Sequence, residues 1–218
     1  DNILLKLAAV IRDPVTTTDE LIPSGETSSY RSNPLRLAEF TLSRRVPAYV
    51  GRSKAIAAQE AERQTGNLPV PIQNALTQIG DAQALAKTTG FGSCVFANKP
   101  GDGSAREQAA SCQRVLGGTA NICYEYATKR YRSNCINWGI LPFTLPAGAE
   151  FPFEEGDMVF VPGIRAAVEQ GLESIPAKTI TQAGVRDITL ELKGLTADER
   201  QILLDGCLMN YYAARKRS

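Results

Sequence analysis

One short segment in the middle of the sequence combines residue types that could bind an anion and move a proton. Residues 99–107 read Lys-Pro-Gly-Asp-Gly-Ser-Ala-Arg-Glu, after an apolar run that predicts a strand and before a pattern that predicts a helix. Glycines let the backbone approach a ligand, and free N–H groups at a helix start favour negative charge. Ser104 could hold an alkoxide there, and Arg106 could bind a carboxylate. Ser104-x-x-Glu107 is also a capping box that needs no ligand, and this interpretation stays open.

Two further polar segments are candidates for binding. Residues 17–25 form a polar loop that contains Thr18 and Asp19, and Arg31 follows twelve residues after Asp19. A turn that caps the next helix is the alternative for that loop. Residues 129–134 concentrate three cations beside a tyrosine, a pattern that marks either RNA binding or a solvated helix face.

The composition restricts the chemistry further. The 218 residues contain no histidine, which excludes a Ser-His-Asp or Cys-His nucleophile and a His-ligated zinc built from this chain alone. Twenty-four Lys and Arg against 23 Asp and Glu leave a net charge of +1, so no general attraction to nucleic acid or an anionic membrane is expected. The five cysteines are Cys94, Cys112, Cys123, Cys135 and Cys207. They form no C-x-x-C pair, which predicts buried, reduced thiols in a cytoplasmic compartment rather than a metal site.

Short apolar runs alternate with helical patterns along the chain. Strands are expected over residues 3–11, 93–97, 119–124, 141–145, 158–161, 178–182 and 186–192, the last two joined by a hairpin around 183–184. Helices are expected over residues 34–45, 49–63 and 72–79, from Ala105, from Thr128, and after a capping box at residues 196–199. The strand–helix series in the middle predicts the α/β class with parallel strands. No apolar run approaches the about 18 residues of a membrane span.

The chain is expected to form one domain over residues 1–218. It starts at Asp1 rather than at Met and enters an apolar segment at once. We therefore expect a fragment of a longer chain, in which a missing N-terminal signal means little.

The order of these motifs resembles the C-terminal swivel domain of the aconitase superfamily. The resemblance runs along nearly the whole chain. It rests on Thr17-Thr18-Asp19, on Gly101-x-Gly103-Ser104-x-Arg106-Glu107, on residues 132–144 (Arg-Ser-Asn-x-x-Asn-Trp-Gly-Ile-Leu-Pro-Phe-Thr) and on Asp205-Gly206-Cys207-Leu208-Met209-Asn210. It implies a three-layer β/β/α swivel domain with a mainly parallel sheet.

The resemblance also implies the reversible dehydration of a hydroxy-di- or tricarboxylic acid. Ser104 then matches the catalytic base, and Asp19 belongs with Thr18 to an active-site Thr-Asp pair. Arg31 and Arg106 match arginines that bind the substrate. The family's 4Fe-4S cluster is bound by domains outside this chain, so the implied partners are those cluster-bearing N-terminal domains and the hydroxy acid. The fragment alone is expected to be inactive, and no metal ligand is assigned to it.

Four positions depart from the family pattern. Ala105 stands where a second serine is common, and Ile22 stands where true aconitases have serine. Glu20 and Gln108 stand where histidines are common. Hydroxyl groups lost around the substrate carboxylates would change which acid fits.

Two other hypotheses compete with the swivel domain of a larger hydratase. One is a non-catalytic module that binds an anion at the Gly101 loop or RNA at residues 129–132. The other is a naturally separate small subunit, as in isopropylmalate isomerases.

Overall fold

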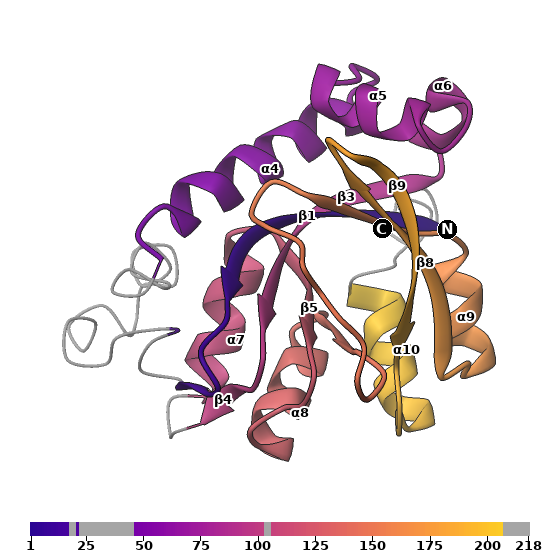
Figure 1. Ribbon diagram of the computed structural model, residues 1–218. Helices are drawn as coiled ribbons and strands as arrows, with labels where there is room; N and C mark the ends of the chain where they lie inside the picture. Colours follow the sequence, from indigo (N-terminus) through magenta and orange to yellow (C-terminus); the bar gives the residue numbers. More distant parts are fainter. Residues whose placement is uncertain (18–20, 22–45, 103–105, 207–218) are drawn as a thin grey trace.

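The computed structural model describes residues 1–17, 21, 46–102 and 106–206, without the side chains of 106–108. Seven strands close into a barrel in the order β1-β3-β5-β6-β9-β8-β7 (Figure 1). These are β1 (Asn2–Ile11), β3 (Thr89–Ala97), β5 (Gly118–Cys123), β6 (Leu141–Thr144), β7 (Met158–Val161), β8 (Ser174–Thr181) and β9 (Gly184–Glu191). Two short strands, β2 (Thr16–Thr17) and β4 (Pro100–Asp102), pair separately.

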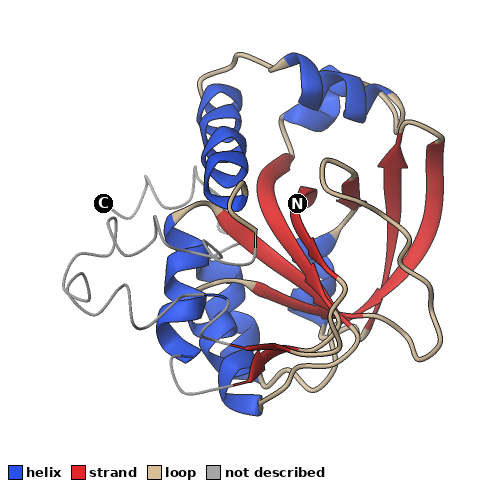
Figure 2. Ribbon diagram, turned by 60° about the vertical axis from the view of Figure 1, so that its left-hand side comes forward, coloured by secondary structure: helices blue, strands red, loops and turns tan. Residues whose placement is uncertain are grey.

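Helices pack around the outside of the strands, as Figure 2 shows. The described helices are α4 (Tyr49–Gln64), α5 (Val70–Thr77), α6 (Ala82–Ala86), α7 (Arg106–Val115), α8 (Lys129–Asn137), α9 (Ile164–Gln170) and α10 (Ala197–Gly206). No helix in this part of the chain is long and apolar enough to cross a bilayer.

Strand β1 is apolar on both faces because each face packs against a different core. Leu5 and Leu7 belong to the cluster that also contains residues of all the other barrel strands. Leu4 and Ala8 point the other way, into the cluster shared with helices α4, α5, α7 and α8. Alternate side chains of a strand face opposite sides, so a run that is apolar except for Lys6 fits a strand buried between two layers.

The α/β class is confirmed, but the described barrel is mixed rather than mainly parallel. The pairs β1–β3, β3–β5 and β5–β6 are parallel. The pairs β1–β7, β7–β8, β8–β9 and β6–β9 are antiparallel. Long crossovers through helices join the strands of the first half and favour parallel neighbours, whereas β8 and β9 are joined by a tight hairpin.

Several expected elements are confirmed and others were missed. The hairpin around residues 183–184 and the capping box are present: Thr196 Oγ1 accepts from the Glu199 N–H at 3.1 Å, and Glu199 Oε1 accepts from the Thr196 N–H at 3.0 Å. The helix expected over 34–45 lies outside the described residues. Strands β2 and β4 and helices α6 and α9 were not expected, because each is too short for a periodic pattern.

The loop over residues 145–157, between β6 and β7, is held by one arginine. The guanidinium of Arg12 donates to the carbonyl oxygens of Phe151 at 2.8 Å and Phe153 at 2.6 Å. Its Cζ also lies 5.4 Å from the centre of the Phe96 ring. These contacts attach the loop to the carboxyl end of β1.

Candidate active site

The short pair β2–β4 brings two of the candidate segments to one place. The strands run parallel, with Thr16 opposite Pro100 and Thr17 opposite Asp102. The Thr16 N–H also donates to the Lys99 carbonyl at 2.9 Å. Parallel strands end at the same edge, so the chain leaves toward residues 18–20 and toward residues 103–105 from neighbouring points.

The predicted site residues themselves fall largely outside the description. Thr18, Asp19, Arg31 and Ser104 all lie outside the described residues. Arg106 is the first residue of α7, but its side chain is not described. The roles assigned to these five residues therefore remain predictions, whereas the scaffold that carries their segments is defined.

Helix α8 holds the segment that leads to Ser104. Gly101 has a φ of +100°, a conformation that favours glycine. Its carbonyl oxygen accepts from Thr128 Oγ1 at 3.3 Å, and the same hydroxyl caps α8 by accepting from the Tyr131 N–H at 3.1 Å. A Cβ at Gly101 would lie 2.3 Å from Tyr131 Cδ1. The sequence suggested that this glycine lets the backbone approach a ligand. In the structure the glycine is required because the backbone lies against the buried Tyr131.

Asn98 joins the loops that follow β1, β3 and β5. Its Nδ2 donates to the Arg12 carbonyl at 2.7 Å and to the Asp13 carbonyl at 3.2 Å. Its carbonyl oxygen accepts from the N–H groups of Tyr124 and Glu125, each at 3.3 Å. Sequence reasoning missed this residue, although a polar amide directly after an apolar strand was a usable signal.

A buried polar network fixes α7 against α8 and β5. Tyr131 Oη donates to Gln113 Oε1 at 3.3 Å, and Asn121 Nδ2 lies 3.4 Å from the same oxygen. Asn121 Nδ2 also lies 3.6 Å from Cys135 Sγ. Burial raises the pKa of Tyr131 well above its ordinary value, so its hydroxyl stays protonated and can donate. The network keeps α7, whose first residue is Arg106, in a defined place beside the Gly101 segment.

The expectation of buried thiols is confirmed for the four described cysteines, Cys94, Cys112, Cys123 and Cys135. Burial is the main cause that raises the thiol pKa of Cys94, Cys123 and Cys135 above its ordinary value. No group of three or more His, Cys, Asp or Glu side chains within the described ranges could hold a metal ion. The four described thiols are enclosed in the packed interior without such a group of ligands around them, so they do not fit an iron–sulfur cluster.

We expect the fold to lose stability as the pH rises above about 9. Burial raises the pKa of Cys135 from 9.0 to about 12 and that of Tyr49 from 10.0 to about 12. Between the unfolded and folded values the folded state binds more protons, so the free energy of unfolding falls by about 1.4 kcal/mol per pH unit for each such group. Urea unfolding from pH 8 to pH 11 measures this loss. Cys135→Ala should make the decline shallower, and a flat profile above pH 9 would contradict the assignment.

The basic segment at the start of α8 is partly occupied by contacts within the chain. Arg132 donates to the Lys193 carbonyl and forms an ion pair with Glu199 at 3.9 Å. Lys129 and Arg130 are exposed. One of the three cations therefore connects α8 to the start of α10, which weakens the hypothesis of an RNA-binding patch.

These features define an α/β barrel domain with a candidate anion site. Two parallel strands end at one edge, hydrogen bonds join the neighbouring loops, and helix α7 starts nearby. Residues 52–148 match the aconitase C-terminal domain family. This match agrees with the family resemblance that the order of the motifs predicted.

Longer relatives match almost the whole chain. A putative mitochondrial aconitate hydratase of Emericella nidulans is 26% identical over 202 residues, which are 91% of this chain and 24% of that protein. The corresponding protein of Aspergillus fumigatus is 25% identical with the same coverage. The chain thus spans about a quarter of the length of these curated relatives.

Smaller relatives match as well. The small subunit of 3-isopropylmalate dehydratase of Metallosphaera sedula is 36% identical over 111 residues, which are 51% of this chain and 58% of that protein. A crystal structure of 3-isopropylmalate dehydratase from Methanocaldococcus jannaschii matches with a TM-score of 0.53 at 21% identity, over 100% of this chain and 96% of that one. This structural likeness supports the fold alone.

Proposed function

We propose that this domain, over residues 1–218, supplies half of the active site of an aconitase-family hydro-lyase that reversibly dehydrates a hydroxy-di- or tricarboxylic acid. The observation that carries the proposal is the parallel pair β2–β4. The chain continues from Thr17 into the Thr18-Asp19 motif and from Asp102 toward Ser104, and those two strand ends are register partners. Motifs 85 residues apart (19 to 104) thus start from adjacent points.

The proposed chemistry suits a chain without histidine. A proton beside a carboxylate is very weakly acidic, and its removal creates a dianion that needs concentrated positive charge. Arg31 and Arg106 would provide that charge. Ser104 would take the proton, and the positive end of helix α7 would make its alkoxide less unfavourable than in water. The hydroxyl group on the neighbouring carbon would leave as hydroxide, for which the 4Fe-4S cluster outside this chain would supply a Lewis acid. Asp19 and Thr18 would complete the site from the facing segment.

The 4Fe-4S cluster of the proposed enzyme would be held by the polypeptide outside this chain. The described cysteines do not fit such a cluster, because all four are buried and no group of three or more potential ligands is gathered among the described residues. The complete site would therefore form only when this domain meets its cluster-bearing partner.

An assay of the assembled enzyme, in which this domain is joined to its cluster-bearing polypeptide, tests the substrate class. The curated relatives point to two classes, an aconitate-type tricarboxylic acid and an isopropylmalate-type dicarboxylic acid. We expect turnover of a hydroxy acid of one class, measured as formation of the unsaturated acid, and none when this domain is omitted. Full activity without the domain, or no turnover of any hydroxy acid by the cluster-loaded assembly, would refute the proposal.

A further inference from the structure

One edge of strand β9 has almost no strand partner among the described residues. Along its length β9 pairs with β8 on one side. On the other side it meets β6 at one position only, where Thr144 lies opposite Glu191. From residue 184 to residue 190, no described residue pairs with this second edge. The strand contains no proline and no bulge, the features that commonly protect a sheet edge.

The even-numbered residues of β9 direct their backbone groups toward β8. The carbonyl oxygen of Arg186 accepts from Thr179 Oγ1 of β8 at 3.1 Å. Directly after the strand, the Leu192 N–H donates to the Glu173 carbonyl at 2.9 Å. Backbone groups alternate in direction along a strand, so the odd-numbered residues must face the free edge.

Two further contacts agree with this alternation. Thr189 lies opposite Pro176, which has no N–H to donate and so suits a position without ladder hydrogen bonds. Glu191 is the residue that pairs with β6. The N–H and C=O groups of Val185, Asp187 and Thr189 therefore point outward, as a regular series of donors and acceptors without described partners.

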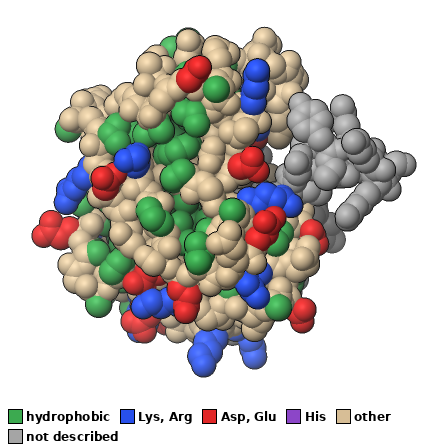
Figure 3. Space-filling view, turned by 90° about the vertical axis from the view of Figure 1, so that its right-hand side faces the viewer, with side chains coloured by type: hydrophobic (Ala, Val, Ile, Leu, Met, Phe, Trp, Pro, Cys, Tyr) green, Lys and Arg blue, Asp and Glu red, His purple; other side chains and the backbone are tan. Residues whose placement is uncertain are grey.

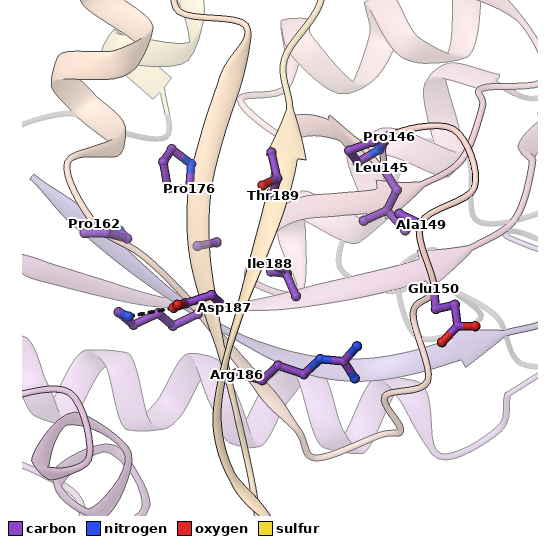
Figure 4. Close-up of a pocket in the computed structure, with 12 residues that line it drawn as sticks. Leu145, Pro146, Ala149, Glu150, Pro162, Pro176, Arg186, Asp187, Ile188 and Thr189 are labelled. Atoms are coloured by element: carbon purple, nitrogen blue, oxygen red, sulfur yellow. Dashed lines mark hydrogen bonds and ion pairs between the residues drawn. The ribbon is translucent and has the colours of Figure 1, made fainter.

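A groove runs along this edge. Its cavity volume is about 620 Å³, within the range of pockets that hold a ligand. One wall is the loop at residues 145–150, and the floor comes from β8 and β9, as Figure 4 shows. The apolar lining consists of Leu145, Pro146, Ala149, Pro162, Pro176, Ala177 and Ile188. The face of the molecule that carries β8 and β9 shows apolar side chains gathered near its centre with charged ones around them (Figure 3).

Four charged side chains border the groove, and only two of them pair with each other. Lys178 Nζ and Asp187 Oδ1 form an ion pair at 2.7 Å. Glu150 and Arg186 also line the groove, and neither has a hydrogen-bonding or ionic partner for its side chain among the described residues. An occupant with one basic and one acidic side chain would complement them.

We propose that an extended segment of the polypeptide carrying the rest of the active site adds as a strand to the free edge of β9 and fills this groove. Only a polypeptide backbone repeats donors and acceptors at the spacing that the edge presents, and apolar side chains alternating along it would face the lining. The inference rests on the proposed function for the existence of that polypeptide. The curated aconitate hydratases are about four times as long as this chain, which leaves ample polypeptide for the segment.

Hydrogen exchange in the intact enzyme tests the pairing at single residues. We expect the amides of Val185, Asp187 and Thr189 to exchange at least about 100-fold more slowly than in an unstructured peptide of the same sequence. The inference is overturned if these three amides exchange freely while those of Ile188 and Leu190, which face β8, are protected.

A matched pair of variants separates edge pairing from folding. Thr189→Pro removes one outward N–H, and Thr189→Val keeps it. Proline is tolerated at an edge whose N–H has no partner, so circular dichroism and the melting temperature should change little in either variant. In the intact enzyme Thr189→Pro should abolish the protection of Val185 and Asp187, whereas Thr189→Val should retain it. Equal protection in both variants overturns the inference.

A photo-crosslinking residue at position 189 identifies the occupant. A crosslinked peptide from the cluster-bearing polypeptide supports the inference. A crosslink to a second copy of this chain, or the absence of any crosslinked peptide, overturns it. The outcomes also separate this inference from the proposed function. An active dehydratase with an unprotected β9 edge refutes the strand addition alone, and a protected edge in an enzyme that dehydrates no hydroxy acid refutes the function alone.

Discussion

Replacing Ser104 by alanine should lower the kcat of the assembled enzyme by about 10²- to 10⁴-fold, the range that a general base contributes. The substitution removes the hydroxyl proposed to take the substrate proton and leaves the backbone of the loop unchanged. Because the carboxylate-binding arginines remain, KM should change much less than kcat. Steady-state kinetics with the substrate found in the assay measures both constants.

The matched control is Ser174→Ala, at the exposed start of β8. It should keep wild-type kinetics, and both variants should melt within a few degrees of the wild type. Near-normal turnover by Ser104→Ala would remove the serine from the mechanism. A loss that appears in KM alone would instead assign Ser104 to substrate binding.

Replacing Gly101 by alanine should destabilise the fold by about 3 kcal/mol and also impair turnover. The added Cβ would lie 2.3 to 2.6 Å from three atoms of Tyr131, which is completely buried and cannot move aside. The positive φ adds strain. For a chain of this length the melting temperature should fall by about 6 to 12 °C. Asp102 and the segment that leads to Ser104 would shift with the glycine, so kcat should fall below that of the wild type.

Gly90→Ala provides the comparison, because a Cβ at Gly90 meets nothing within 4 Å and its φ is not positive. A glycine inside a strand is slightly unfavourable, so this variant should be as stable as the wild type or slightly more so. If the melting temperature of Gly101→Ala stays within about 2 °C of the wild type, the loss in free energy of unfolding is about 1 kcal/mol or less. That result would show that the contact with Tyr131 is not tight.

Local patterns in the sequence were sufficient for most of the elements. The apolar run over residues 3–11, interrupted only by Lys6, predicted a strand, and the structure confirms that strand with a core on each side. The helical spacing in α4 and the capping box before α10 were equally informative. Such signals work because burial repeats with the period of the element itself.

Pairing between distant strands left no such signal. The mixed barrel depends on which strands become neighbours, and the meeting of Thr144 with Glu191 joins residues 47 positions apart (144 to 191). The missed strands β2 and β4 show the same limit, since each has too few residues for a periodic pattern. Their pairing is nevertheless what brings the two candidate segments together.

The sequence by itself determined the chemistry that this protein can offer: a chain without histidine, a Gly-x-Gly-Ser-x-Arg segment before a helix, and a Thr-Asp motif near the start. Those features follow from residue types and short spacings, which need no knowledge of distant neighbours. Only the tertiary structure decided that Gly101 packs against Tyr131, that Asn98 joins three loops and that one edge of β9 meets a single residue in the described part of the chain. Each of these depends on how separate elements pack and pair, because hydrogen-bond partners and close contacts are set by the fold as a whole.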